Sequence, residues 1–255
     1  MKAPAFDYVR ADSATDACAL LGQYGPDARL LAGGQSLLPA MNLRLASPSV
    51  LIDIGRITGL DGIEVRGNAL HIGALVRHET LLRSATVASH VPLLTEAMRH
   101  VAHPAIRARG TIGGNLAHAD PASELPACML ALNAAFQATS ATGARTIAAG
   151  DFFTGLFQTA LEPDEILTAI HIPLPVPNFF FQEIARRSGD YAIVGLAASG
   201  ERLAFFSVSD RPVLFHASAP LDLNPQTDLQ ATAAMRLHLA GVLRQRAMTA
   251  LGLQP

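Results

Sequence analysis

Two glycine-containing stretches carry the residues best suited to bind an anionic ligand. In the first, an apolar run leads directly into Ala32, Gly33, Gly34, Gln35, Ser36 and Leu37. Because glycine has no Cβ, the backbone N–H groups there can approach a ligand closely, and successive N–H groups in such a turn can bind an anion. Ser36 adds a hydroxyl donor. The stretch would suit a pyrophosphate, although a Gly-Gly pair after a strand is also typical of a plain tight turn.

The second stretch, Arg109-Gly110-Thr111-Ile112-Gly113-Gly114-Asn115, offers glycine flexibility together with a hydroxyl group and a side-chain amide. It continues through Ala117, His118, Asp120 and Ser123 to Glu124. We expect residues 110–121 to form a loop, because four of them are glycine or proline. Glu124 then begins an expected helix, where the helix dipole favours a carboxylate. The same carboxylate could equally accept hydrogen bonds from ribose hydroxyls.

Neither stretch has a standard nucleotide-binding fingerprint. The second does not read G-x-G-x-x-G, and the chain has no Gly-Lys-Ser/Thr of a phosphate-binding P-loop. Two separate glycine-containing loops instead predict one extended, dinucleotide-like ligand that is held from two lobes. No pair of histidines has the spacing of a metal site, so we expect no metal in this chain. His103 could face the ligand or be an ordinary loop histidine.

Composition excludes several other classes of protein. The chain has 255 residues, of which 50% are hydrophobic and 16% charged, with a formal net charge of −2. We therefore expect a folded protein with a large core and no affinity for nucleic acid. No apolar run approaches the length of a membrane span, and residues 1–13 lack the apolar core of a signal peptide. A cytoplasmic location is expected by default.

The two cysteines, Cys18 and Cys128, both stand in apolar surroundings. Free cysteine is among the most buried residue types, so we expect two buried, reduced thiols. Two thiolates cannot ligate an iron–sulfur cluster that needs four.

The elements that would position the two stretches alternate between short apolar runs and helical patterns, which predicts a mixed α and β fold. Ser13 or Thr15 should cap a helix that ends before Gly25-Pro26. The other expected helices are 78–83, 92–101, 124–132 and 229–251, and the expected strands are 6–9, 28–32, 50–54, 69–75, 135–139, 145–148, 166–172, 179–185 and 203–208.

In the last helix, apolar Met235, Leu239, Val242 and Leu243 should oppose a polar face that carries Arg236, Arg244 and Arg246. Pro173, Pro175 and Pro177 mark a boundary, because each removes a hydrogen-bond donor. We expect a two-lobed unit at residues 1–176, with lobes of about 1–56 and 57–176, and a smaller C-terminal unit at 177–255.

Taken in order, these motifs resemble a known family. Residues 32–39, Ala-Gly-Gly-Gln-Ser-Leu-Leu-Pro, followed by residues 109–115, resemble the flavoprotein subunit of the molybdopterin dehydrogenases. That family includes the medium subunit of aerobic carbon monoxide dehydrogenase and the FAD domain of xanthine dehydrogenase. The resemblance covers almost the whole chain, from Phe6-Asp7-Tyr8 through residues 186–192, Arg-Arg-Ser-Gly-Asp-Tyr-Ala, to residues 238–243, His-Leu-Ala-Gly-Val-Leu.

The resemblance implies an α+β fold: a two-lobed FAD-binding domain of the PCMH type, followed by a small, shortened C-terminal sheet-plus-helix domain. It places the FAD pyrophosphate on Ala32 to Leu37 from one side and on Gly110, Thr111, Gly114 and Asn115 from the other. Tyr191 would lie near the isoalloxazine ring. No residue is expected to be catalytic, because electrons pass through the flavin. The remaining positions that match flavin contacts of the family are Ala117, His118, Ser123 and Glu124.

The resemblance also implies partners. In this family, electrons pass from molybdenum through two [2Fe–2S] clusters to FAD, and then to NAD, a quinone or another acceptor. The clusters and the molybdopterin cofactor would belong to a small iron–sulfur subunit and a large molybdenum subunit, in a dimer of heterotrimers. The organic substrate would be chosen in the molybdenum subunit.

Two departures leave alternatives open. Many relatives carry a lysine just before the paired arginines, where this chain reads Gln182-Glu183-Ile184-Ala185, and the stretch 209–229 is short. The chain could therefore be a non-catalytic structural subunit with a degenerate flavin site. The other alternative is a self-contained FAD oxidoreductase, such as an oxidase or the enolpyruvylglucosamine reductase, although residues 177–255 offer no evident substrate domain.

Overall fold

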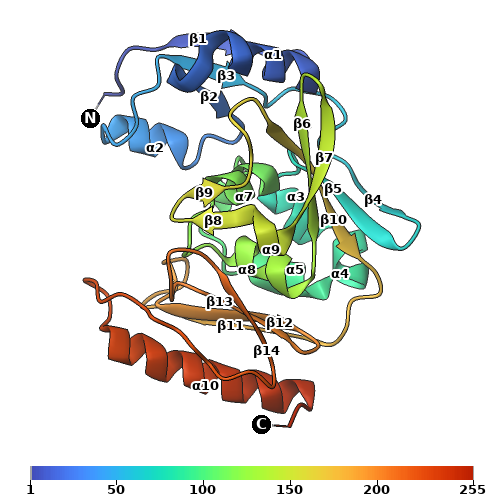
Figure 1. Ribbon diagram of the computed structural model, residues 1–255, viewed down its shortest axis with the longest axis vertical. Helices are drawn as coiled ribbons and strands as arrows, with labels where there is room; N and C mark the ends of the chain where they lie inside the picture. Colours follow the sequence, from blue (N-terminus) through green and yellow to red (C-terminus); the bar gives the residue numbers. More distant parts are fainter. Residues whose placement is uncertain (1, 255) are drawn as a thin grey trace.

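A computed structural model describes residues 2–254, and its sheets fall in three consecutive parts of the chain (Figure 1). At the top of the view, three parallel strands have the order β1-β3-β2, with β3 paired to both neighbours. Ser13 caps helix α1 by accepting a hydrogen bond from the N–H of Asp16, and Gly25 ends the helix. The bounds are β1 Asp7–Arg10, α1 Ala14–Tyr24, η1 Gly25–Asp27, β2 Ala28–Leu31, α2 Leu37–Asn42 and β3 Val50–Asp53.

The middle part is an antiparallel sheet in the order β4-β5-β10-β6-β7, with helices and a β8–β9 hairpin beside it (Figure 1). Helices α5, α7 and α8 contribute to one large apolar core with this sheet. The strands are β4 Ile63–Arg66, β5 Ala69–Gly73, β6 Ala135–Ser140, β7 Gly143–Ala148, β8 Phe153–Gly155, β9 Gln158–Thr159 and β10 Ile166–Pro173. The helices are α3 His78–Arg83, α4 Ala85–His90, α5 Pro92–Met98, α6 Pro104–Arg107, α7 Ile112–His118, α8 Glu124–Ala131 and α9 Ala149–Phe152.

The C-terminal part is an antiparallel sheet in chain order, β11-β12-β13-β14, covered on both faces. Val194, Leu196 and Ala198 of β12 belong to the core shared with α10, while Ala197 belongs to the core shared with α8. Side chains alternate between the faces of a strand, so a strand between two helices is buried throughout. The bounds are β11 Phe179–Ile184, β12 Val194–Ser199, β13 Arg202–Phe206, β14 Val213–His216 and α10 Ala233–Leu251.

The expected α+β class is confirmed, and two local expectations were wrong. Residues 110–121 are not a continuous loop, because α7 occupies residues 112–118. In α10 the expected faces are partly exchanged: Met235 is 51% exposed, whereas Arg236 is 5% exposed. Arg236 tolerates burial because its guanidinium donates to the carbonyl oxygens of Ile193 and Ser207 and pairs with Asp228.

Cys18 and Cys128 are both free and buried, as expected. Among residues 2–254, no helix combines the length and the apolar character that crossing a membrane would require.

Candidate functional site

The two glycine-containing stretches meet backbone to backbone. A Cβ placed on Gly33 would lie 2.4 Å from the carbonyl oxygen of Arg109 and 2.8 Å from the Cα of Gly110. Both distances are too short for any side chain, so only glycine at position 33 permits this contact. A Cβ on Gly114 would lie 3.7 Å from the Cβ of Ala32. The structure therefore brings together residues from the N-terminal and middle parts that the sequence separates.

In the first stretch, the backbone N–H groups are free. Within residues 2–254, no oxygen accepts a hydrogen bond from the N–H of any residue from 33 to 37. Gly34 has φ +71°, and the side-chain amide of Gln35 donates to the carbonyl oxygen of Gly33 at 3.1 Å, which braces the turn. Five consecutive unsatisfied donors form a cradle for an anionic group.

In the second stretch, the corresponding N–H groups are already used by the protein. Those of Ile112 and Gly113 donate to the carbonyl oxygens of Val76 and Ala74 at 3.0 and 2.8 Å. The N–H of Gly114 donates to the Thr111 hydroxyl at 3.1 Å, so Thr111 caps α7. A helix forms where the sequence indicated a loop because these external acceptors and the cap satisfy its first turn. Gly113 is required for packing, since its Cβ would lie 2.5 Å from that of Ala74.

One side of α7 is open to solvent and faces the first stretch. Gly114, Ala117 and His118 are exposed, and Asn115 is half-buried. The Ser123 hydroxyl donates to Asn115 Oδ1 at 3.0 Å, which orients the Asn115 amide. The expected site residues on this helix thus share a surface that is continuous, through Gly114, with Ala32.

Glu124 does not reach that surface. It is 6% exposed, and burial raises its pKa to about 8. The carboxyl group of Glu183 adds to this rise in pKa, and His100 opposes it. Glu183 pairs with the Nδ1 of His100 at 3.2 Å, so the stretch just before Arg186 contributes a buried carboxylate. The two carboxyl groups belong to the contact between α8 and the C-terminal sheet.

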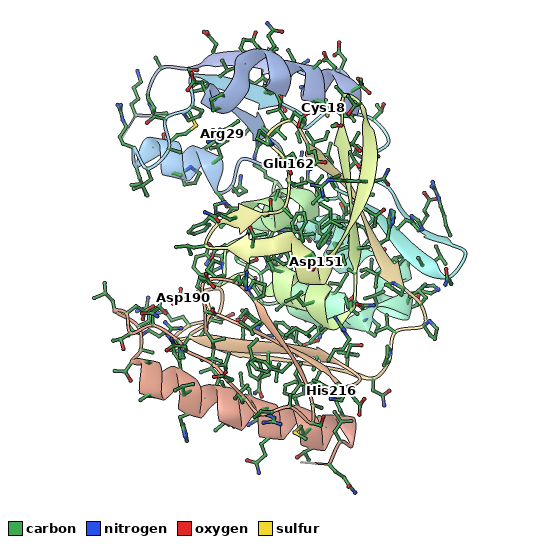
Figure 2. The ribbon with its side chains drawn as sticks, viewed as in Figure 1. Cys18, Arg29, Asp151, Glu162, Asp190 and His216 are labelled. Atoms are coloured by element: carbon green, nitrogen blue, oxygen red, sulfur yellow. The ribbon has the colours of Figure 1, made fainter. Side chains whose placement is uncertain are left out.

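Tyr191 lies in the open, at the end of a loop that rests on the middle part of the chain. The residue is 57% exposed, while partial burial of its hydroxyl raises the pKa of Tyr191 to about 12. Within the same loop, a Cβ on Gly189 would lie 2.5 Å from Cε1 of His103, so the His103 ring packs against this loop. Figure 2 labels the intervening Asp190, on the same side of the view as α2 and the β8–β9 hairpin of Figure 1.

The tip of the β8–β9 hairpin carries a candidate site residue, Phe157, that the sequence did not indicate. Phe157 is 51% exposed, has φ +53°, and places its ring 5.0 Å from that of His118. A strained, exposed aromatic residue beside a candidate site is a functional candidate. No motif marks it in the sequence, because a lone phenylalanine after Gly155-Leu156 matches any tight turn.

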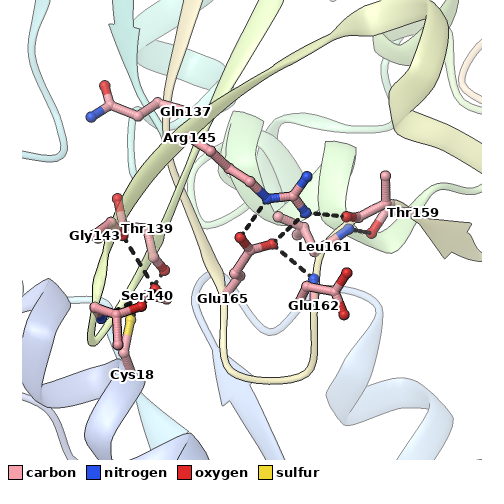
Figure 3. A network of polar contacts seen from close by, with 12 residues as sticks. Cys18, Gln137, Thr139, Ser140, Gly143, Arg145, Thr159, Leu161, Glu162 and Glu165 are labelled. Atoms are coloured by element: carbon pink, nitrogen blue, oxygen red, sulfur yellow. Dashed lines mark hydrogen bonds and ion pairs between the residues drawn. The ribbon is translucent and has the colours of Figure 1, made fainter.

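A polar network fixes the chain that follows this hairpin (Figure 3). The Arg145 guanidinium binds both oxygens of Glu165, at 2.6 and 2.8 Å, and donates to the Ala160 carbonyl oxygen at 2.7 Å. Glu165 also accepts from the N–H of Glu162. This bidentate pair joins β7 to the segment between β9 and β10.

The free N–H groups of the first stretch and the open side of α7 together have the chemistry that an extended anionic ligand such as a nucleotide requires. Residues 4–175 match the family described as the FAD binding domain in molybdopterin dehydrogenase. The chain belongs to that family, which confirms the resemblance drawn from the motifs and identifies the nucleotide cofactor as FAD. It is a medium subunit of the dehydrogenase complexes in which this flavin domain occurs.

Three relatives illustrate the match. The chain is 47% identical to the nicotine 6-hydroxylase medium subunit of Paenarthrobacter nicotinovorans, over 77% of this chain and 69% of that protein. It is 38% identical to the carbon monoxide dehydrogenase medium chain of Afipia carboxidovorans, over 95% of each. A solved structure of carbon monoxide dehydrogenase from Hydrogenophaga pseudoflava superposes with a TM-score of 0.92 at 35% identity, covering 98% of both chains.

Proposed function

We propose that this chain is the electron-transfer flavoprotein of a heterotrimeric molybdenum hydroxylase or dehydrogenase. It binds one FAD non-covalently, accepts electrons from [2Fe–2S] clusters of a small partner subunit, and passes them to an external acceptor. A large partner subunit holds the molybdopterin cofactor and oxidises the organic substrate. Two such heterotrimers form the complete assembly.

The observation that carries the proposal is the row of free N–H groups from Gly33 to Leu37, in backbone contact with Arg109 and Gly110. A pyrophosphate supplies the acceptors that these donors lack. We assign Gly33, Gly34, Gln35 and Ser36 to the pyrophosphate, and the open side of α7 to the remainder of the cofactor, with Ala32, Leu37, Gly110, Thr111, Gly114, Asn115, Ala117, His118 and Ser123 completing the site.

The division of the chain supports the proposed roles of its parts. We propose that residues 1–176 hold the FAD, in lobes of about 1–56 and 57–176, and that residues 177–255 close the site with the loop that carries Tyr191. The clusters are assigned to the partner because two cysteines cannot supply four thiolates. Relatives that are named medium or beta subunits of dehydrogenases support the assignment to a multi-subunit complex.

The test is a titration of the purified full-length chain with FAD, followed by quenching of flavin fluorescence. We expect saturation at one FAD per chain and release of the flavin into the supernatant after acid precipitation. Flavin that stays with the precipitate would contradict non-covalent binding. A chain that binds no FAD, alone or with the proteins that co-purify with it, would favour the structural subunit with a degenerate site.

A further inference from the structure

The imidazole of His78 lies directly beneath the contact between the two glycine-containing stretches. His78 begins α3, and its backbone N–H donates to the Gly110 carbonyl oxygen at 2.9 Å. A Cβ on Gly110 would lie 3.0 Å from Nδ1 and 3.2 Å from Cε1 of the His78 ring. Gly110 in turn touches Gly33. The ring, Gly110 and Gly33 therefore follow one another from the interior to the free N–H groups.

The His78 ring is buried, and its ring nitrogens make no hydrogen bond of ordinary geometry, although the backbone of Thr111 lies close by. The residue is 4% exposed, and neither ring nitrogen has a hydrogen-bond partner. Buried polar groups in proteins are nearly always hydrogen-bonded, so an unpartnered imidazole calls for a reason beyond packing. Its position under a ligand-binding contact provides one.

The charged groups around the ring do not favour its protonated form. Arg107, at the end of α6, is a cation and opposes a second positive charge. Arg77 donates to the carbonyl oxygen of Arg109, and the neighbouring carboxylate of Glu79 is engaged by Arg83 and Arg107. Burial lowers the pKa of His78 from 6.5 to about 4; the backbone of Thr111 opposes this decrease, and the positive charge of Arg107 adds to it.

We propose that His78 is a positioning residue of the cofactor site, whose neutral ring supports the contact between Gly33 and Gly110 and whose protonation separates the two stretches and weakens FAD binding. The inference rests on the proposed FAD site and adds an acid-sensitive support to it.

The direction of the pH effect follows from the two states of the ring. When the stretches separate, the ring meets water and regains a pKa near 6.5, so the separated state takes up a proton that the closed state refuses. The closed state, in which the two stretches are in contact, is fully favoured above pH 6.5. Its population relative to the separated state decreases as the pH falls through about 4. Over that window, the ratio of closed to separated protein falls by up to about 300-fold.

The test measures the Kd for FAD of the full-length chain between pH 4.5 and 8, with His78→Phe, His78→Gln and His78→Ala. Phenylalanine keeps a flat ring without a titratable or unpartnered nitrogen. Should the larger ring prevent folding, glutamine provides a second non-titrating side chain. His238→Phe is the control, because His238 is an exposed histidine on α10.

For the wild type and His238→Phe, we expect a constant Kd above pH 6.5 and weaker binding as the pH falls. His78→Phe or His78→Gln should bind with a Kd that stays flat across this range, while His78→Ala should bind at least tenfold more weakly at every pH. A flat profile for the wild type, or the same acid loss in a folded non-titrating variant, would overturn the role of His78. Absence of FAD binding by the wild type at pH 8 would instead overturn the proposed function.

Discussion

The two glycine-containing stretches look alike in sequence and differ in what their backbones do. From Gly33 to Leu37, the N–H groups have no protein acceptor. From Ile112 to Gly114, each N–H group is bound by the protein, two by the strand-to-helix segment at Ala74 and Val76 and one by Thr111. The backbone of the first stretch leaves its N–H groups available to a ligand, whereas the backbone N–H groups of the second are used to hold α7 in place. Glycine alone does not separate these roles; hydrogen-bond satisfaction does.

The largest effect should come from the point where the two stretches touch. Gly33→Ala would place a methyl group 2.4 Å from the Arg109 carbonyl oxygen, which is backbone and cannot rotate away. We expect loss of measurable FAD binding, together with a loss of stability of about 1–3 kcal/mol from overpacking. Flavin content after purification and fluorescence titration measure the binding.

Gly22→Ala is the matched control for Gly33→Ala. Gly22 lies in α1, where an added Cβ meets nothing within 4 Å. This variant should bind FAD normally and be slightly more stable, because alanine favours a helix over glycine. Equal flavin content in both variants would show that the contact at Gly33 has no role in binding.

A smaller loss of affinity is expected at Gly114, which lies on the open side of α7. In Gly114→Val, Cβ would lie 2.8 Å from the Thr111 hydroxyl and 3.7 Å from the Cβ of Ala32, and the two methyl groups would add further bulk there. We expect FAD binding to weaken by about 100-fold, or about 2.7 kcal/mol. Gly241→Val in α10 is the control, since a Cβ there meets nothing within 4 Å. If Gly114→Val and Gly241→Val bind FAD with equal affinity, Gly114 has no role in FAD binding.

The two adjacent glycines of α7 should then separate binding from stability. The Cβ of Gly113→Ala would lie 2.5 Å from that of Ala74, in the interior. Thermal or urea unfolding should show a loss of about 2 kcal/mol, with FAD affinity reduced far less than in Gly114→Val. A Gly113→Ala protein that keeps wild-type stability but no longer binds FAD would contradict this assignment of stability to Gly113 and binding to Gly114.

Glu124, the buried first residue of α8, allows a test of how stability depends on pH. Its pKa is raised from 4.5 to about 8, mainly by burial. The contribution of a group with a raised pKa is fully present below 4.5 and is lost as the pH rises through about 8. Glu124→Gln should therefore be close to the wild type near pH 5 and be more stable at pH 9, by up to about 5 kcal/mol. Unfolding curves with the same difference at both pH values would show that the carboxyl group does not titrate in this way.

The sequence predicted the framework of the fold because apolar periodicity and helix caps are local signals. Ser13 before α1, Gly25 after it and the three prolines after β10 were all visible in the sequence. The assignment of α7 to a loop failed because its glycines are tolerated only through Ala74, Val76 and the cap at Thr111, and such distant partners leave no local pattern. The buried Arg236 was missed for the same reason, since two of its three partners are carbonyl oxygens distant in the chain.

For the site, motif order gave the family and the two stretches, but not their different roles. The contact between Gly33 and Arg109 depends on how the first sheet sits above the second, which no single stretch encodes. Burial of Glu124 required the C-terminal sheet, and the tip at Phe157 required the hairpin to reach His118. Tertiary contacts therefore decide which residues of a correct motif face the ligand.

The smallest effect is expected at the cap of α7. Thr111→Val keeps the shape of the side chain and removes the oxygen that accepts from the N–H of Gly114 at 3.1 Å. The loss in stability should be about 1 kcal/mol, the usual value for an N-cap. Freed from its acceptor, the N–H of Gly114 would become available to a ligand, so the second stretch would gain one feature of the first. The loss in free energy of FAD binding should accordingly be smaller than the loss in free energy of unfolding. Thr111→Ser should retain both the affinity and the stability of the wild type. Calorimetric unfolding with and without FAD separates the two quantities. A Thr111→Val protein that loses affinity as severely as Gly33→Ala would mean that the Thr111 hydroxyl contacts the cofactor directly, in addition to capping α7.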